Sequence, residues 1–193
     1  RDCARLTELH ARVGSAPADY SEDGRLLYYL DANGRYGSGD TLRRLLDHLD
    51  RIGMLGQILL IEEPFPEESQ SEVGDFPVMI AADESLHDVG DVRRRIDQGY
   101  GAMTLKAAGK TLSMTFAMAA AAHARGVPAL VADSSCVPAL LGWNLNVAAR
   151  LPSLPGMNCG ILESNGLESY RNWAERVHAH ATCGARFLSK DTT

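Results

Sequence analysis

Three short sequences place a carboxylate where an apolar segment ends. They are Leu-Asp-Ala-Asn, Ile-Glu-Glu-Pro and Ala-Asp-Glu-Ser, and their first acidic residues are Asp31, Glu62 and Asp83. Carboxylate oxygens are the hard ligands that Mg²⁺ prefers in proteins. If the three apolar segments are parallel strands of one barrel, their carboxyl ends meet at one rim. The pattern therefore predicts a divalent-metal site formed by these three carboxylates.

A lysine ends the next apolar segment, residues 102–106. Lys106 is one of only three lysines among the 19 Lys and Arg residues. It lies on the strand that follows Asp83 and would therefore stand beside the metal. Because burial and a nearby cation both disfavour the ammonium form, we expect the pKa of Lys106 to be lowered. A neutral amine at this place can accept a proton, so Lys106 is the candidate catalytic base.

Apolar strands alternate with amphipathic helices along most of the chain. The expected strands are residues 26–31, 58–62, 78–83, 102–106, 129–133 and 159–163. Asp40 should cap the second of the expected helices, which are residues 3–13, 41–52, 92–98, 111–125, 139–150 and 168–181. Such alternation requires a parallel sheet with right-handed crossovers, either open or closed. Polar residues end nearly every strand, which favours a TIM-type (β/α) barrel over an open sheet whose chemistry lies at one switch point.

The number of strand-helix units bears on domain organisation. The chain supplies six, whereas a closed barrel of this kind has eight. We therefore expect residues 1–193 to be a partial (β/α)-barrel catalytic domain, with about two units before Arg1. The strand at 26–31 should then lie at an edge of the sheet.

The four strand ends, taken in order, resemble the barrel domain of the enolase superfamily, in particular its mandelate racemase and muconate lactonizing enzyme branch. The likeness runs from about Leu26 to Lys106 and more loosely to Glu163. It implies an enzyme that binds Mg²⁺ through the three carboxylates and removes the proton alpha to a carboxylate of a small-molecule acid, giving a metal-stabilised enediolate. Positive charge concentrated at the carboxylate oxygens is what makes so weak an acid accessible. The outcome would be that of an isomerase or lyase: racemisation or epimerisation, dehydration, or cycloisomerisation.

The resemblance also points to groups that contact the substrate. Glu163 is similar to a strand-end glutamate that in some members hydrogen-bonds the substrate carboxylate, and Ser135, with Ser134, ends the preceding strand. Glu63 and Glu84 each follow a proposed metal ligand by one residue. They should therefore point away from the barrel interior and have structural roles.

Some features of the family pattern have no counterpart. The Lys-x-Lys strand that carries a second catalytic lysine and the N-terminal α+β capping domain would both precede Arg1. Residues 107–110, Ala-Ala-Gly-Lys, follow Lys106 in place of the usual double glycine. A non-catalytic or degenerate barrel fragment that retains the metal carboxylates is therefore an alternative.

Each motif also has a simpler interpretation. Acidic residues after strands often bind local backbone amides, so loop capping is the alternative for each carboxylate taken alone. Residues 109–111, Gly-Lys-Thr, resemble the end of a phosphate-binding loop, but Thr104 stands where that motif needs its first glycine. Nucleotide binding there is the weaker alternative. Trp143 and Trp173 fall in expected helices, where packing explains them.

Composition argues against other classes of function. The formal net charge of -6 argues against a nucleic-acid partner, because phosphate binding needs a basic face. No window approaches the roughly 20 apolar residues of a membrane span, and no signal peptide is visible. The four cysteines lie far apart, without the spacing of a zinc site or a disulfide framework. We therefore expect a cytoplasmic protein. The family resemblance implies that it is an enzyme whose partners are a small carboxylate-bearing substrate and, in the full-length protein, further copies of itself.

Overall fold

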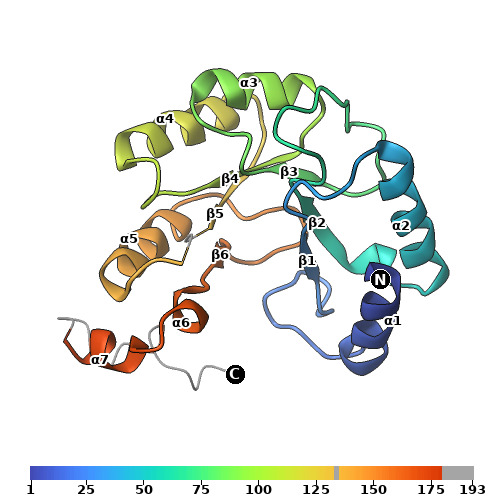
Figure 1. The fold of residues 1–193 in the computed structure, drawn as a ribbon, viewed down its shortest axis with the longest axis horizontal. Coiled ribbons are helices and arrows are strands. Elements are labelled where there is room, and N and C mark those ends of the chain that lie inside the picture. The colour runs from blue at the N-terminus through green and yellow to red at the C-terminus, as the bar shows by residue number, and fades with distance from the viewer. Residues whose placement is uncertain (133–134, 180–193) are drawn as a thin grey trace.

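The computed structural model describes residues 1–132 and 135–179. Six strands form one sheet in the order in which they occur in the chain, and every neighbouring pair is parallel. The strands are β1 (Tyr28–Asp31), β2 (Ile58–Glu62), β3 (Ile80–Ala82), β4 (Ala102–Leu105), β5 (Ala129–Ala132) and β6 (Leu162–Glu163). The sheet curls into a half-barrel with helices along its outer side (Figure 1). As expected, β1 lies at an edge of the sheet.

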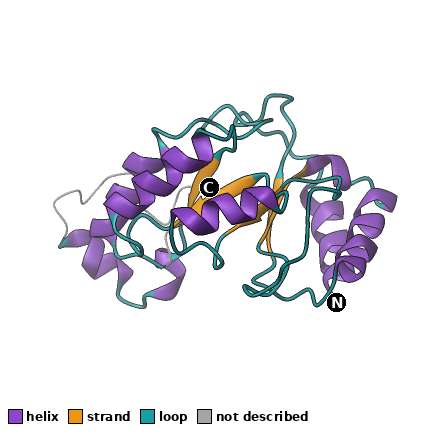
Figure 2. Cartoon of the chain, turned by 90° about the horizontal axis from the view of Figure 1, so that it is seen from above, coloured by secondary structure: helices purple, strands orange, loops and turns teal. Residues whose placement is uncertain are grey.

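Helices connect most of the strands. The longer ones are α1 (Asp2–Val13), α2 (Gly39–Arg51), α3 (Val89–Asp97), α4 (Leu112–His123) and α5 (Pro138–Ala148). The short ones are the 3-10 helix η1 (Leu55–Gln57), α6 (Gly166–Ser169) and α7 (Trp173–His178). Figure 2 shows the strands at the centre of the molecule with helices and loops around them. In the part of the chain that the structure describes, no helix has the length and apolar character needed to cross a membrane.

Strand β2 begins and ends where it was predicted. Two expectations about helices are wrong. The N-cap of α2 is Ser38 and not Asp40, because the Ser38 hydroxyl is the group that accepts a hydrogen bond from the first turn, from Thr41 N. The segment predicted as one helix at 168–181 is divided, because Tyr170 has an extended backbone between α6 and α7. Its last two residues lie outside the described part of the chain.

The outer core forms between the helices and the convex face of the sheet. Four leucines of α2 recur with helical spacing and are buried: Leu42, Leu45, Leu46 and Leu49. They belong to the same cluster as Ile61 of β2 and Ile80 of β3. Burial of each leucine contributes about 1.5–3 kcal/mol, so this face fixes α2 and the loop that leads to it from Asp31.

The concave face of the sheet is apolar near the amino ends of the strands. Its buried cluster takes one residue from each of four strands: Leu60, Ala81, Ala102 and Leu130. Tyr20 and Met157, from the loops that precede β1 and β6, pack against this cluster. The same two loops are joined by hydrogen bonds from Asn158 N to Tyr20 O (2.8 Å) and from Glu22 N to Gly156 O (2.9 Å). These loops form a floor for the half-barrel, and the polar strand ends lie at the opposite rim.

Candidate functional site

The register of the sheet brings the predicted carboxylates to one face. Asp31 pairs with Glu62, and Glu62 pairs with Ala81, which precedes Asp83 by two residues. Side chains alternate along a strand, so paired residues and residues two apart share a face. Asp31, Glu62 and Asp83 therefore all lie on the concave face, above the apolar cluster.

Glu62 and Asp83 form the buried part of the site. They are 2% and 3% exposed, respectively. Burial, followed by the charges of Asp83 and Glu163, raises the pKa of Glu62 to about 9. The Tyr29 hydroxyl donates a hydrogen bond to Glu62 Oε2, but Asp83 Oδ1 is buried without a hydrogen-bond partner. The raised pKa of Glu62 thus reflects burial beside a second carboxyl group.

Lys106 is the cation that the structure places in this site. Its Nζ lies 2.6 Å from Asp83 Oδ2, and its side chain is 23% exposed. Burial lowers the pKa of Lys106, but the carboxylates of Asp83, Glu84 and Glu62 outweigh it, so the pKa is raised. Our expectation of a lowered pKa is thus wrong for this arrangement, because carboxylates are the charges nearest to the amine.

Asp31 is less engaged than the other two carboxylates. It is exposed and accepts hydrogen bonds from Asn33 N (2.9 Å) and from the Asn33 side-chain amide. This is the loop-capping interaction that Asp commonly makes after a strand. Within residues 1–132 and 135–179, no group of three or more His, Cys, Asp or Glu side chains is arranged to hold a metal ion.

The donor set nevertheless suits a hard divalent cation. Asp83 Oδ1 and Glu84 Oε2 are both buried without hydrogen-bond partners. Burial and then the charge of Asp83 raise the pKa of Glu84. A cation bound here would satisfy these carboxylate oxygens and lower the raised carboxyl pKa values. The chemistry of Glu62 and Asp83 therefore fits Mg²⁺, provided that Lys106 releases Asp83, and Asp31 could join them once it leaves Asn33.

Glu63 points away from the concave face and has the structural role expected of it. Its side chain is buried, and Oε2 accepts hydrogen bonds from Asp83 N (2.6 Å), Ser85 N (3.3 Å) and Ser85 Oγ (2.9 Å). Sequence reasoning missed Ser85 and also Tyr29. Alternation was the available signal for Tyr29, because it precedes Asp31 by two residues on the same strand.

The predicted substrate-binding residues lie on the far side of the rim. Glu163 pairs in register with Ala132, and its charge reaches Glu62. Ser135 N donates a hydrogen bond to Asn165 Oδ1 (2.6 Å), and Ser135 Oγ accepts one from Ser169 Oγ (2.9 Å). Ser135 is thereby tied to α6. Its predicted neighbour at position 134, like the strand end at position 133, lies outside the described residues.

The loop between β4 and α4 does not resemble a phosphate cradle. Gly109 N and Lys110 N both donate hydrogen bonds to Lys106 O, at 2.9 Å each. Thr111 Oγ1 accepts a hydrogen bond from Met114 N and caps α4. A phosphate-binding loop offers its amides to the ligand, whereas these amides are already used. Burial lowers the pKa of Lys110, which sequence reasoning considered only as part of this motif.

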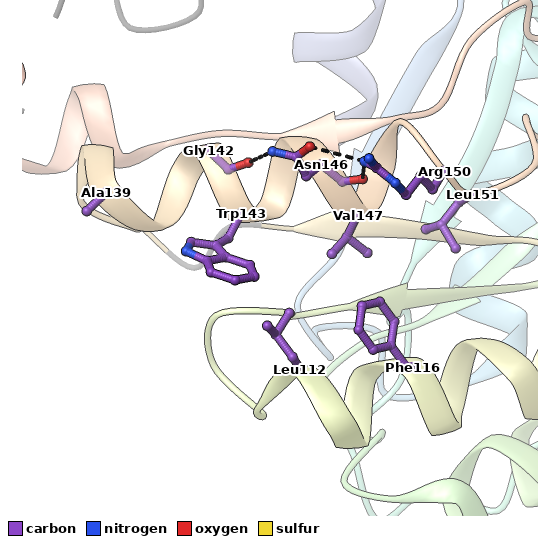
Figure 3. Close-up of a pocket in the computed structure, with 9 residues that line it drawn as sticks. All are labelled: Leu112, Phe116, Ala139, Gly142, Trp143, Asn146, Val147, Arg150 and Leu151. Atoms are coloured by element: carbon purple, nitrogen blue, oxygen red, sulfur yellow. Dashed lines mark hydrogen bonds between the residues drawn. The ribbon is translucent and has the colours of Figure 1, made fainter. Parts of the chain in front are cut away.

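A large groove lies elsewhere, on the outer side between α4 and α5 (Figure 3). Its volume is about 630 Å³, and Leu112 and Phe116 line one side of it while Trp143 lines the other. Trp143 is 56% exposed, so packing does not explain this residue as expected. Trp173 is 2% exposed, which confirms the expectation for that residue. None of the strand-end residues lines this groove, so it is distinct from the rim site.

This chain resembles known proteins in both sequence and fold. The family model described as enolase C-terminal domain-like matches residues 1–177. A mandelate racemase/muconate lactonizing protein from Herpetosiphon aurantiacus is similar with a TM-score of 0.68 and 21% identity, over 85% of this chain and 43% of that chain. 2-Chloromuconate cycloisomerase from Rhodococcus opacus is similar with a TM-score of 0.65 and 21% identity, over 86% of this chain and 42% of that chain. A dipeptide epimerase from Enterococcus faecalis, solved with Mg and a dipeptide, is similar with a TM-score of 0.55 and 20% identity, over 68% of this chain and 35% of that chain.

The chain spans less than half the length of these solved structures. A search of the curated proteins gives no match. At these identities the structural likeness establishes the fold, a curled half-barrel that matches part of a TIM-type barrel. The family match covers far more than half of the chain and includes the strand ends that carry the carboxylates and Lys106. The chain therefore belongs to the enolase C-terminal domain-like family, among proteins related to mandelate racemase and muconate lactonizing enzyme.

Proposed function

We propose that this protein catalyses the Mg²⁺-dependent removal of the proton alpha to a carboxylate of a small-molecule acid, with Lys106 as the base. The observation that supports it is the cluster of buried Glu62 and Asp83 with half-buried Lys106 at the rim of a half-barrel of this family. The Lys106 amine lies beside the carboxyl groups of Asp83 and Glu62, and this arrangement suits both parts of the reaction, cation binding and proton transfer. The carboxylates bind a cation, and the amine moves a proton.

Each side chain of the site has a part in this proposal. Glu62 and Asp83 would hold Mg²⁺, and Asp31 would join them after turning from Asn33. Bound there, the cation would supply the positive charge that a carbanion beside a carboxylate requires. Lys106 must be neutral to accept a proton, so its ion pair with Asp83 has to open before catalysis. Asp83 would thus exchange Lys106 for the cation.

The remaining parts of the proposal concern the substrate and the rest of the protein. Glu163 and Ser135, on the opposite side of the rim, would contact the substrate. Racemisation or epimerisation, dehydration and cycloisomerisation all begin with this proton transfer, so the rim residues named here serve each of them. We propose that residues 1–193 supply six of eight barrel units, and that the full-length protein is a cytoplasmic homo-oligomer.

Proton exchange tests the proposal directly. The full-length protein is incubated with Mg²⁺ in deuterated water with a panel of carboxylic acids that includes dipeptides and muconate, and deuterium incorporation at the α-carbon is measured by NMR. Lys106→Met should abolish exchange at one face of the α-carbon while Mg²⁺ affinity is retained. Lys110→Met, a matched change four residues along the same loop, should leave exchange unchanged.

The alternative of a non-catalytic barrel fragment gives a different result. It predicts no exchange with any acid of the panel, even when Mg²⁺ binds with normal affinity. Exchange that persists in Lys106→Met would instead show that another group is the base on that face. Loss of exchange in Lys110→Met as well would mean that the loop and not the Lys106 amine is responsible.

A further inference from the structure

A buried charged network lies behind Asp83, on the convex side of the sheet. Glu63 has φ of +33°, in the left-handed region that few residues other than glycine adopt. Its side chain accepts hydrogen bonds from Asp83 N and from both the backbone N and the Oγ of Ser85. The residue after one proposed metal ligand therefore bonds directly to the backbone of the next one.

The cation of this network is Arg95 of α3, whose side chain is fully buried. Its Nε donates a hydrogen bond to Ser85 Oγ (2.9 Å), and its Nη1 donates one to Ser69 O (2.8 Å) and one to Gln98 Oε1 (2.9 Å). Its Nη2 donates a hydrogen bond to Glu67 O. The loops that follow β2 and β3 thus share one guanidinium, which only the planar fork of arginine can serve in this way.

The Ser85 hydroxyl joins the two buried charges. It has one hydrogen, which it donates to Glu63, so its oxygen accepts from Arg95. Glu63 Oε1 has no hydrogen-bond partner, so the network retains an unsatisfied buried oxygen. Replacing buried charged groups with apolar residues is often neutral or stabilising, so stability alone does not account for this network. A role in setting the geometry at Asp83 does account for this network.

We infer that Arg95, Ser85 and Glu63 form a positioning relay that holds Asp83 on the concave face, where it meets Glu62 and Lys106. The relay acts through the backbone, since Glu63 bonds to Asp83 N and not to the Asp83 carboxylate, which faces Lys106. Partners of this kind set the orientation of metal ligands, and their loss typically weakens metal binding about 10–100-fold. The inference rests on the proposed function, in which Asp83 is a metal ligand.

The test measures Mn²⁺ affinity of the full-length protein by electron paramagnetic resonance, with no substrate present. Ser85→Ala should weaken Mn²⁺ binding at least about tenfold. The matched control is Ser21→Ala at the floor, where an equally buried hydroxyl donates a hydrogen bond to Arg25 O (2.7 Å). It should lower the melting temperature to a similar extent and leave Mn²⁺ affinity unchanged. Ser85→Thr, which keeps a hydroxyl, should restore most of the affinity.

Each outcome either supports or overturns the relay. Unchanged Mn²⁺ affinity in a folded Ser85→Ala variant overturns it, and so does an equal loss in Ser21→Ala. If Ser85→Ala does not fold, Arg95→Lys is measured, because it keeps the charge but not the fork and should also weaken binding. Failure of both to fold would make the network a requirement for folding and overturn the positioning role. Asp83→Asn tests the proposed function separately: normal Mn²⁺ affinity in that variant removes the metal site itself.

Discussion

Two corners of the rim differ in how firmly they hold their carboxylate. Asp83 is buried, pairs with Lys106 and has its backbone bound by Glu63. Asp31 is exposed at the edge strand and is bound by Asn33, two residues away. Both lie at the carboxyl end of a strand and share the concave face, so sequence position alone would make them equivalent. Neighbouring elements make the difference, since β3 lies inside the sheet and β1 at its edge.

The comparison shows what preorganises a ligand. A carboxylate whose backbone is fixed by tertiary contacts from two loops and a helix keeps its position when it exchanges one cation for another. One that caps its own loop must first give up a local interaction, and that cost reduces its contribution to binding. The structure therefore fixes the Asp83 corner through several elements and the Asp31 corner only through its own loop.

Removal of Arg95 should break the braced corner and have the largest effect. Arg95→Met leaves Ser85 Oγ, Ser69 O and the buried Glu63 charge without their cation, which should reduce the free energy of unfolding by about 3–5 kcal/mol. Arg93→Met on the same helix removes an exposed arginine and should change it by less than about 0.5 kcal/mol. Urea unfolding of both variants measures the difference. Similar values for the two would show that burial of Arg95 does not brace the corner.

Ligand removal at each corner should sharpen the contrast. Asp83→Asn should weaken Mn²⁺ binding roughly a hundredfold and Asp31→Asn roughly tenfold, a difference of about 1.4 kcal/mol. The reason is that Glu63 holds the backbone of Asp83 in place, whereas Asp31 lies at the exposed edge and must turn away from Asn33. Calorimetric titration of the two variants with Mn²⁺ measures both. Equal losses would mean that the Asn33 contact costs nothing and that the two corners are equivalent.

Tyr29 connects the two corners, because it belongs to β1 and its hydroxyl donates a hydrogen bond to Glu62. Tyr29→Phe should reduce the free energy of unfolding by about 1 kcal/mol, the usual size for one buried hydrogen bond. Tyr20→Phe is the control, since that ring packs on the same concave cluster. A smaller change in Tyr29→Phe than in Tyr20→Phe would remove Tyr29 from the site.

Asn33 should give the smallest effect. Its φ of +48° lies in the left-handed region, which glycine adopts readily, so Asn33→Gly keeps the backbone and removes only the side-chain contact to Asp31. The free energy of unfolding should change by less than about 0.5 kcal/mol. Chemical denaturation measures it, and a loss as large as that of Tyr29→Phe would show that the exposed contact is structurally important.

Short-range patterns in the sequence predicted much of the fold. The apolar runs gave six parallel strands in chain order, and β2 agrees residue for residue. Alternation then placed the strand-end carboxylates on one face. Periodicity was less reliable where a single side chain decides: Ser38 and not Asp40 caps α2, and Trp143 is exposed although its helix is apolar on nearly all sides.

The sequence by itself determined which residue types meet at the rim. The two-residue period of a strand and the parallel pairing of strands joined by helices can both be inferred from the sequence pattern. Only the tertiary structure decided how each is used. Three arginines follow one another on α3, and helical spacing from Val92 singles out Arg95 for the buried face. Its partners come from two other loops, and the pKa values of Glu62 and Lys106 depend on charges brought in by neighbouring strands. Burial and Coulomb interaction act through space, and a linear pattern does not contain those distances.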